Sequence, residues 1–99
     1  MSDSVVKPKA EIQTEKPKLY RVLLLNDDYT PREFVVVVLK GEFRLSEEQA
    51  TRVMITAHRK GVSVVMVYPR DVAETKAERA TELAAKMGFP LRFYAEPEE

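Results

Sequence analysis

Three segments of the chain are rich in apolar and β-branched residues, and turn-forming residues bound them. Residues 19–25 read Leu-Tyr-Arg-Val-Leu-Leu-Leu and lie between Pro17 and an Asn-Asp-Asp cluster. Residues 62–68 read Val-Ser-Val-Val-Met-Val-Tyr and stop at Pro69. Runs of this length with these borders favour strands over helices. We therefore predict strands at 19–25 and 62–68, the second of them buried, and a short last strand at 91–95.

A helix is predicted directly after the first strand. Thr30, Pro31 and Glu33 match a helix start, with threonine as the cap, proline at the first helical position and glutamate three residues after the cap. Four consecutive valines follow, and these prefer a strand by intrinsic propensity. The start pattern and the later apolar positions nevertheless indicate a helix from about 31 to 43.

Two further helices have clear borders. Ser46 and Gln49 form a capping box, and Gly61 ends the second helix after apolar residues at helical spacing. Asp71 is the predicted cap of the third helix, which Gly88 terminates. The apolar face of this third helix consists of Ala73, Ala77, Ala80, Leu83, Ala84 and Met87.

The order of these elements predicts the fold class. Three strands and three helices in the order β-α-α-β-α-β indicate a two-layer α/β (α+β) domain. We expect a three-stranded antiparallel sheet packed with three helices, with one face of the sheet covered. The acidic end, residues 96–99, is expected to fray.

The first seventeen residues differ from the rest of the chain. They contain two Lys-Pro pairs and few apolar residues, and these show no periodicity. Such a stretch cannot bury enough apolar surface to offset its chain entropy. We predict a flexible extension over 1–17 and a folded core over 18–99. The extension lacks the apolar run of a signal peptide or membrane span, so we expect neither.

Composition narrows the possible functions. The chain has no cysteine, which rules out a disulfide framework or a thiolate metal site. Sixteen basic and sixteen acidic residues give a formal net charge of +0, whereas nucleic-acid binding needs a basic cluster. We expect a soluble globular domain that binds neither nucleic acid nor membrane.

The candidate chemistry lies in Asn26, Asp27 and Asp28, which follow the first strand, and in His58, the only histidine. Loops that leave a rigid strand often carry binding groups, but an Asn-Asp-Asp run also suits an ordinary turn. His58 equally suits a surface position near the C-terminus of a helix. The residues alone leave these interpretations open.

Catalysis is poorly supported. Asp27, Asp28 and His58 match no metal-binding motif, and no second histidine or cysteine exists to complete a ligand set. No nucleophile elbow or phosphate-binding loop is present. We therefore expect neither an enzyme nor a metal or cofactor.

Two motifs, in the same order along the chain, resemble the ClpS adaptor family. Residues 25–31 read Leu-Asn-Asp-Asp-Tyr-Thr-Pro and residues 72–76 read Val-Ala-Glu-Thr-Lys. The resemblance covers everything except the extension. It also includes Lys18 to Val22, Glu33 to Val35, Ala50, Thr51, Met54, His58, Gly61, Pro90 and Leu91.

The resemblance implies a function. Members of this family bind N-end rule substrates, which begin with Leu, Phe, Tyr or Trp, and deliver them to a ClpA-type AAA+ unfoldase that feeds the ClpP peptidase. By position, Asn26, Asp27 and His58 would hold the free α-amino group of the substrate, and Asp28 would fix the neighbouring backbone. The resemblance also implies a cytoplasmic location, and we expect a monomer.

The family's hydrophobic pocket corresponds to Thr30, Arg32, Val35, Met54, Ala57 and Leu91. Two of these depart from the family pattern, which usually has methionine in place of Arg32 and valine in place of Ala57. A shorter side chain at 57 leaves a wider pocket, and Arg32 can contact an aromatic ring through its cation. We therefore expect a shift of preference toward aromatic first residues.

The resemblance further assigns Asp71 and Lys76 to docking on the N-terminal domain of the unfoldase, and the extension to delivery after docking. Asp71 as a plain helix cap and Lys76 as a solvated charge are the alternatives. A ribosome-associated or other protein-docking domain remains the competing function, because a domain of the ribosomal stalk has a similar fold and fold alone does not assign function.

Overall fold

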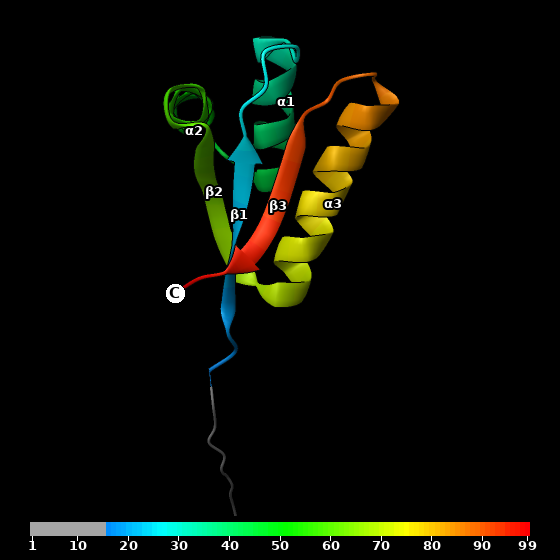
Figure 1. Cartoon of the computed structure of the whole chain (residues 1–99). Coiled ribbons are helices and arrows are strands. Elements are labelled where there is room, and N and C mark those ends of the chain that lie inside the picture. Colours follow the sequence, from blue (N-terminus) through cyan, green and yellow to red (C-terminus); the bar gives the residue numbers. More distant parts are fainter. Residues whose placement is uncertain (1–15) are drawn as a thin grey trace, which may run out of the picture.

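The structure is a computed structural model that describes residues 16–99 and contains three strands and three helices (Figure 1). The order β-α-α-β-α-β and the three-stranded antiparallel sheet confirm the predicted fold class. The predicted extension over 1–17 lies outside the described residues, apart from Lys16 and Pro17, which are exposed. The elements are β1 (Leu19–Leu25), α1 (Arg32–Phe43), α2 (Glu47–Lys60), β2 (Val62–Pro69), α3 (Arg70–Lys86) and β3 (Arg92–Pro97).

Strand β1 is the centre of the sheet, whose strand order is β2-β1-β3. Leu24 lies opposite Ser63 on one side and opposite Phe93 on the other, and all three side chains point into the core. A bulge interrupts the pairing with β2 between Val22 and Leu23. Because cross-strand partners share a face, this register fixes which side chains of all three strands are buried.

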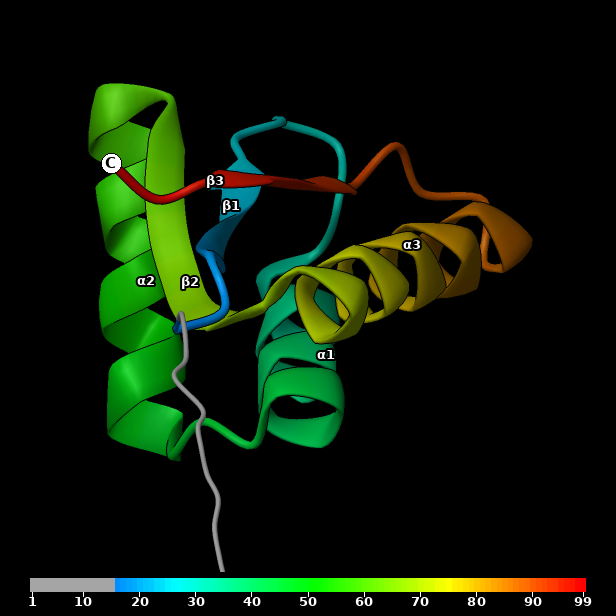
Figure 2. The ribbon, with the colours of Figure 1, turned by 90° about the horizontal axis from the view of Figure 1, so that it is seen from below.

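Helices α1 and α3 cover one face of the sheet, and α2 lies beside the edge strand β2 (Figure 2). The largest buried side chains come from β1 and α1, and the Phe43 ring packs 5.3 Å from the Phe93 ring between centroids. The opposite face of the sheet is open, and Val64 and Tyr94 on it are 46% and 45% exposed. One covered face agrees with the prediction.

The helix α1 forms despite its valine run because four of its apolar residues reach the core. The predicted cap is wrong: the helix begins at Arg32, with Pro31 as an extended N-cap residue and no side-chain capping bond. Thr30 is instead engaged by the loop before it, as described below. The buried residues of this helix are Val35, Val38, Leu39 and Phe43.

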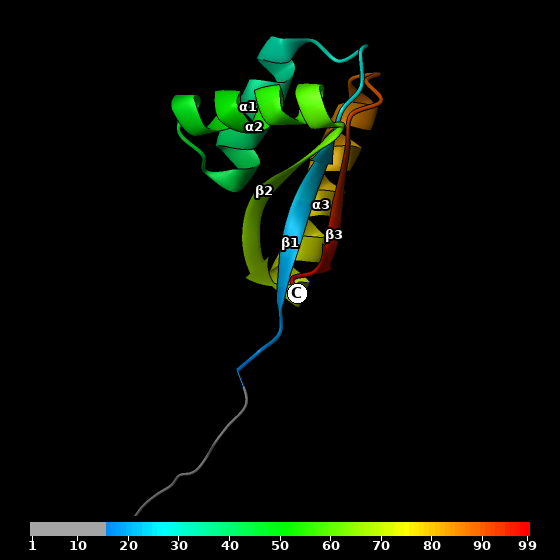
Figure 3. The ribbon, with the colours of Figure 1, turned by 60° about the vertical axis from the view of Figure 1, so that its left-hand side comes forward.

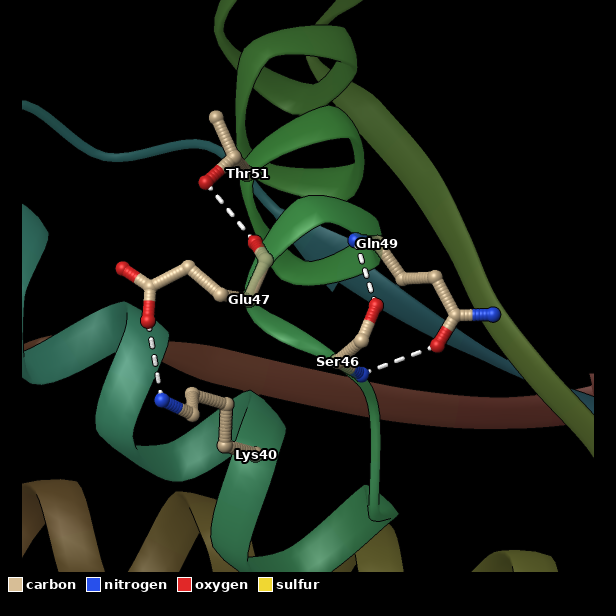
Figure 4. A network of polar contacts seen from close by, with 5 residues as sticks. All are labelled: Lys40, Ser46, Glu47, Gln49 and Thr51. Carbon is tan, nitrogen blue, oxygen red and sulfur yellow. Dashed lines mark hydrogen bonds and ion pairs between the residues drawn. The ribbon is translucent and has the colours of Figure 1, made fainter.

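The capping box of α2 is confirmed (Figure 4). The Ser46 hydroxyl accepts a bond from the Gln49 backbone N–H at 3.1 Å, and the Ser46 N–H donates to Gln49 Oε1 at 2.9 Å. Lys40 on α1 pairs with Glu47 at 2.9 Å between Nζ and Oε1, which ties the two helices together. Gly61 ends α2 in the left-handed conformation, at φ 89°.

The prediction of a buried second strand is wrong for one face of β2. Ser63 and Val65 are buried, but the alternate residues Val62 and Val64 are exposed. The physical reason is topological, since an edge strand of a sheet with one open face buries only alternate side chains.

Two predictions for α3 are also wrong. Asp71 makes no side-chain capping bond, because the helix begins at Arg70 with Pro69 as its N-cap residue. Leu83 and Met87, placed on the buried face by their spacing, are 45% and 58% exposed. The buried residues of α3 are all alanines, and their small side chains let the helix lie close to the sheet. They are Ala73, Ala77, Ala80 and Ala84.

The last strand is longer than predicted. It runs to Pro97, so Glu96 belongs to the sheet, where it pairs with Arg21 at 2.8 Å between Oε2 and Nε. The Glu98 N–H donates to the Leu19 carbonyl at 2.9 Å, so fraying is wrong for residues 96–98. The outer edge of β3 is met by α3, where Thr81 Oγ1 accepts from the Phe93 N–H at 2.9 Å and donates to its carbonyl at 3.3 Å.

Two glycines have opposite expected responses to substitution. Gly41 lies inside α1 with no atom within 4 Å of an added Cβ, so Gly41→Ala is expected to raise the unfolding free energy by about 0.5–1 kcal/mol. Gly61→Ala puts a Cβ on a left-handed residue and is expected to lower it by about 1–2 kcal/mol. Thermal and urea unfolding of the two variants measures both changes. A stability for Gly41→Ala at or below that of the unmodified chain would contradict this account.

Candidate functional site

A hollow of about 440 Å³ opens where the end of β1, the start of α1, the last turns of α2 and the approach to β3 meet. A cavity of this size is typical of small-ligand sites. All ten residues predicted for the binding site and its pocket line this one hollow: Asn26, Asp27, Asp28, Thr30, Arg32, Val35, Met54, Ala57, His58 and Leu91.

The sheet register brings the distant segments together. Leu25, the last residue of β1, lies opposite Val62 in β2 and opposite Arg92 in β3. Gly61 and Leu91, the residues just before those partners, are therefore carried to the loop that follows β1. The Asn26 N–H donates to the Gly61 carbonyl at 3.0 Å, which fixes the loop against the end of α2.

The Asp27 carboxylate organises the loop between β1 and α1. Its Oδ1 accepts bonds from the backbone N–H groups of Tyr29 and Thr30, both at 2.8 Å. The Thr30 hydroxyl lies 2.9 Å from each of the two carboxylate oxygens. This confirms the turn interpretation of Asp27. A carboxylate has about four lone-pair positions, so its oxygens can still accept a bond from a ligand.

Polar groups form the rim of the hollow and apolar groups form its floor. Asn26 lies beside the end of α2, and His58 is one turn before Gly61 and exposed. The deeper lining residues Leu24, Val35, Ala57 and Leu91 are buried, whereas Met54 is partly exposed. A cavity with acceptors at its mouth and hydrocarbon below suits a molecule that has a cationic or polar head and an apolar side chain.

Sequence reasoning missed four lining residues, Leu24, Leu25, Ile55 and Arg59. Ile55 lies on α2 three residues before His58, so helical spacing could have identified it. Arg59 follows His58 directly, and helical spacing does not place these two side chains on the same face. Leu24 and Leu25 were assigned only to the strand, and nothing in a strand pattern marks its last residues as pocket walls.

The two predicted docking residues are not among those that line the hollow, and both belong to the first half of α3. The start of α3 lies at the opposite end of the sheet from the loop that follows β1 (Figure 3). Asp71 is exposed, and the interpretation as a helix cap is wrong. Lys76 is not a freely solvated charge, because its Nζ donates to the Glu42 carbonyl at 2.8 Å and lies 5.6 Å from the centre of the Tyr68 ring. Burial and the negative charge of Glu42 raise the pKa of Tyr68.

Within residues 16–99, no group of three or more histidine, cysteine, aspartate or glutamate side chains is arranged to hold a metal ion. None of the helices in this described part of the chain is long and apolar enough to span a membrane.

Comparison with known proteins identifies close relatives. Residues 15–94 match the family model of the ATP-dependent Clp protease adaptor protein ClpS. The chain is 62% identical, over the full length of both proteins, to ATP-dependent Clp protease adapter protein ClpS 2 of Mesorhizobium japonicum. It is 64% identical to adapter protein ClpS 1 of Rhodopseudomonas palustris, over 94% of this chain and 90% of that protein.

The fold has a solved counterpart. The structure of Agrobacterium tumefaciens ClpS2 bound to L-phenylalaninamide superposes with a TM-score of 0.81 at 65% identity, over 84% of this chain and 100% of that one. The family match spans both motifs and nearly all of the described elements. The chain therefore belongs to the ClpS family of ATP-dependent Clp protease adaptor proteins.

Proposed function

We propose that this adaptor binds the free N-terminal residue of N-end rule substrates, when that residue is bulky and apolar or aromatic. It then delivers them to a ClpA-type AAA+ unfoldase for degradation by ClpP. The observation that carries the proposal is the hollow itself, which joins an acceptor-rich rim to a buried apolar floor. The protein acts by binding and carries out no catalysis.

The rim suits an α-ammonium group. Asn26, Asp27 and His58 offer an amide oxygen, a carboxylate and a ring nitrogen to its three N–H donors, and Asp28 can bond the next backbone group. Hydrogen bonds to charged groups contribute roughly 1.5–3 kcal/mol each. The L-phenylalaninamide bound by the related Agrobacterium protein carries a free α-amino group and a benzyl side chain, which supports the same mode here.

The floor suits the first side chain. Burying a Leu or Phe side chain among Val35, Met54, Ala57 and Leu91 contributes roughly 1.5–3 kcal/mol. Association costs offset part of both contributions, so we expect a Kd of about 1 µM, equivalent to about 8 kcal/mol. Neither the polar rim nor the apolar floor binds tightly alone, so the adaptor requires both a free α-amino group and a suitable first side chain.

Fluorescence anisotropy of peptides labelled at the C-terminus tests the proposal. Peptides starting with Phe are expected to bind, whereas N-acetyl-Phe and Gly peptides lose at least about ten-fold in affinity, since each loses one half of the contacts. His58→Ala is expected to weaken binding, and Lys60→Ala, on the same helix but outside the hollow, is the matched control.

Acetylation is the sharper control, because Asp27→Ala also removes the bonds that hold its own loop. Equal binding of free and acetylated Phe peptides would refute recognition of the α-amino group.

Arg32 and Ala57 are proposed to shift the preference toward aromatic first residues. The wider pocket accommodates a ring, and a guanidinium over an aromatic face contributes about 0.5–1 kcal/mol at an exposed site. Phe peptides are therefore expected to bind about three-fold more tightly than Leu peptides, with the difference reduced in the double variant Arg32→Met, Ala57→Val. Leu binding at least as tightly as Phe in the unmodified protein would contradict this.

Asp71 and Lys76 are proposed to contribute to docking on the N-terminal domain of the unfoldase. Asp71 is exposed and can contact a partner. The Lys76 ammonium already donates one hydrogen bond to the Glu42 carbonyl of α1, so docking there would extend an existing contact. The docking residues are not among those that line the hollow, so substrate and unfoldase can be bound together.

A monomeric state and a cytoplasmic location stay predictions. The relatives are Clp protease adapters, which does not favour the ribosome-associated alternative.

The proposed extension over residues 1–17 gives a separable prediction. Deleting it is expected to leave the Kd for Phe peptides within two-fold, because none of the hollow's lining residues is removed. Degradation of a Phe-initiated substrate by the unfoldase and peptidase is expected to stop. Equal degradation rates with and without the extension would show that it has no part in delivery.

A further inference from the structure

Two arginines from different helices line the hollow. Arg32 is the first residue of α1, and Arg59 lies in the last turn of α2, next to His58. Both residues are exposed, whereas the floor beneath them is buried. The two guanidinium groups therefore belong to the rim, where they stay hydrated and can meet groups of a bound chain.

Neither of these arginines forms an ion pair with any other residue in the part of the chain from 16 to 99. In that same part, Arg21, Arg70 and Arg79 each lie within 3.5 Å of a carboxylate oxygen. Within the described residues, neither guanidinium group is therefore held in an ion pair with a carboxylate.

The charge of the occupied site would be positive. Besides His58, the ionisable residues lining the hollow are Asp27, Asp28, Arg32 and Arg59, whose formal charges cancel. A bound α-ammonium group adds one positive charge. The N-terminus of α1, the positive end of its dipole, lies at the same rim and adds to it.

A polypeptide held by its first residue must leave the hollow over this rim. Consecutive Cα atoms are 3.8 Å apart, so the second and third residues lie within about 8 Å of the first. That is no farther than the Debye length of about 8–10 Å at moderate ionic strength, so their charges are only partly screened from the rim.

We propose that Arg32 and Arg59 form a cationic rim that selects substrates with acidic side chains at the second and third positions. The inference rests on the proposed N-terminal recognition and specifies its substrate class further. Carboxylates there can meet the guanidinium groups in a paired geometry, which arginine favours over other cations. Lysine at the same positions would add to the uncompensated positive charge.

The test compares three labelled peptides that begin Phe-Glu-Glu, Phe-Gln-Gln and Phe-Lys-Lys and are otherwise identical. By anisotropy at about 50 mM salt, Phe-Glu-Glu is expected to bind about ten-fold more tightly than Phe-Lys-Lys, with Phe-Gln-Gln between them, as two exposed charge pairs allow. The difference in affinity between the three peptides is expected to vanish near 1 M salt, where the Debye length is about 3 Å. Arg59→Gln is expected to reduce the ratio of Phe-Glu-Glu to Phe-Lys-Lys affinity, and Arg59→Glu is expected to abolish it.

Lys18→Glu is the matched control. It makes the same change of charge at an exposed residue before β1, at the far end of that strand from the hollow. It is expected to leave the order of the three peptides unchanged. Because the whole chain has a formal net charge of +0, overall attraction cannot produce the preference. Thermal unfolding checks that each variant is folded.

The outcomes separate the two proposals. Equal affinity for the three peptides, with Phe-Gln-Gln still preferred over Gly-Gln-Gln, overturns the cationic rim and leaves N-terminal recognition standing. A preference for Glu that persists in Arg59→Glu, or that is equally strong in acetylated peptides, overturns the assignment to these arginines. No preference for Phe over Gly overturns N-terminal recognition and the rim with it.

Discussion

Leu25 is paired on both sides, with Val62 in one neighbouring strand and Arg92 in the other, and the hollow is a consequence of that register. The three segments that line it are far apart in the chain. They meet because β1 ends at the edge of the sheet where the antiparallel strands β2 and β3 begin. A shift of the strand register by one residue would turn the side chains of the shifted strand to the opposite face of the sheet. It would also move α2, which carries His58, and Leu91 relative to the loop that follows β1. The core and the site thus share one geometric origin.

The loop that follows β1 combines structure with chemistry in a single side chain. Asp27 bonds the two backbone N–H groups and the hydroxyl that reverse the chain into α1. An aspartate that stabilises its own turn is held in one orientation before any ligand arrives. Such preorganisation lowers the entropy lost on binding. The turn interpretation and the binding interpretation, which compete when only the sequence is considered, are therefore compatible.

Periodicity predicted the elements well where local signals agreed, as in the capping box at Ser46 and the strand 19–25. It failed where the outcome depended on packing between elements. The spacing of Leu83 and Met87 matches the buried face of α3, yet small alanines occupy the contact and leave these larger residues outside. The candidate site residues were identified from resemblance to a family, because no local pattern indicates that the end of a strand, the end of a helix and Leu91 converge. Arg59 was missed for the same reason.

Thr81 has a consequence for how this molecule can meet unfolded chains. Its hydroxyl occupies both the N–H and the carbonyl of Phe93 on the outer edge of β3, the groups through which another strand would begin to pair. An exposed edge would capture any extended polypeptide through main-chain bonds, with little regard to which end was offered. Because Thr81 of α3 already bonds both backbone groups of Phe93, another strand cannot pair with β3 at this residue. At this position the edge of the sheet therefore does not compete with the hollow for an extended chain.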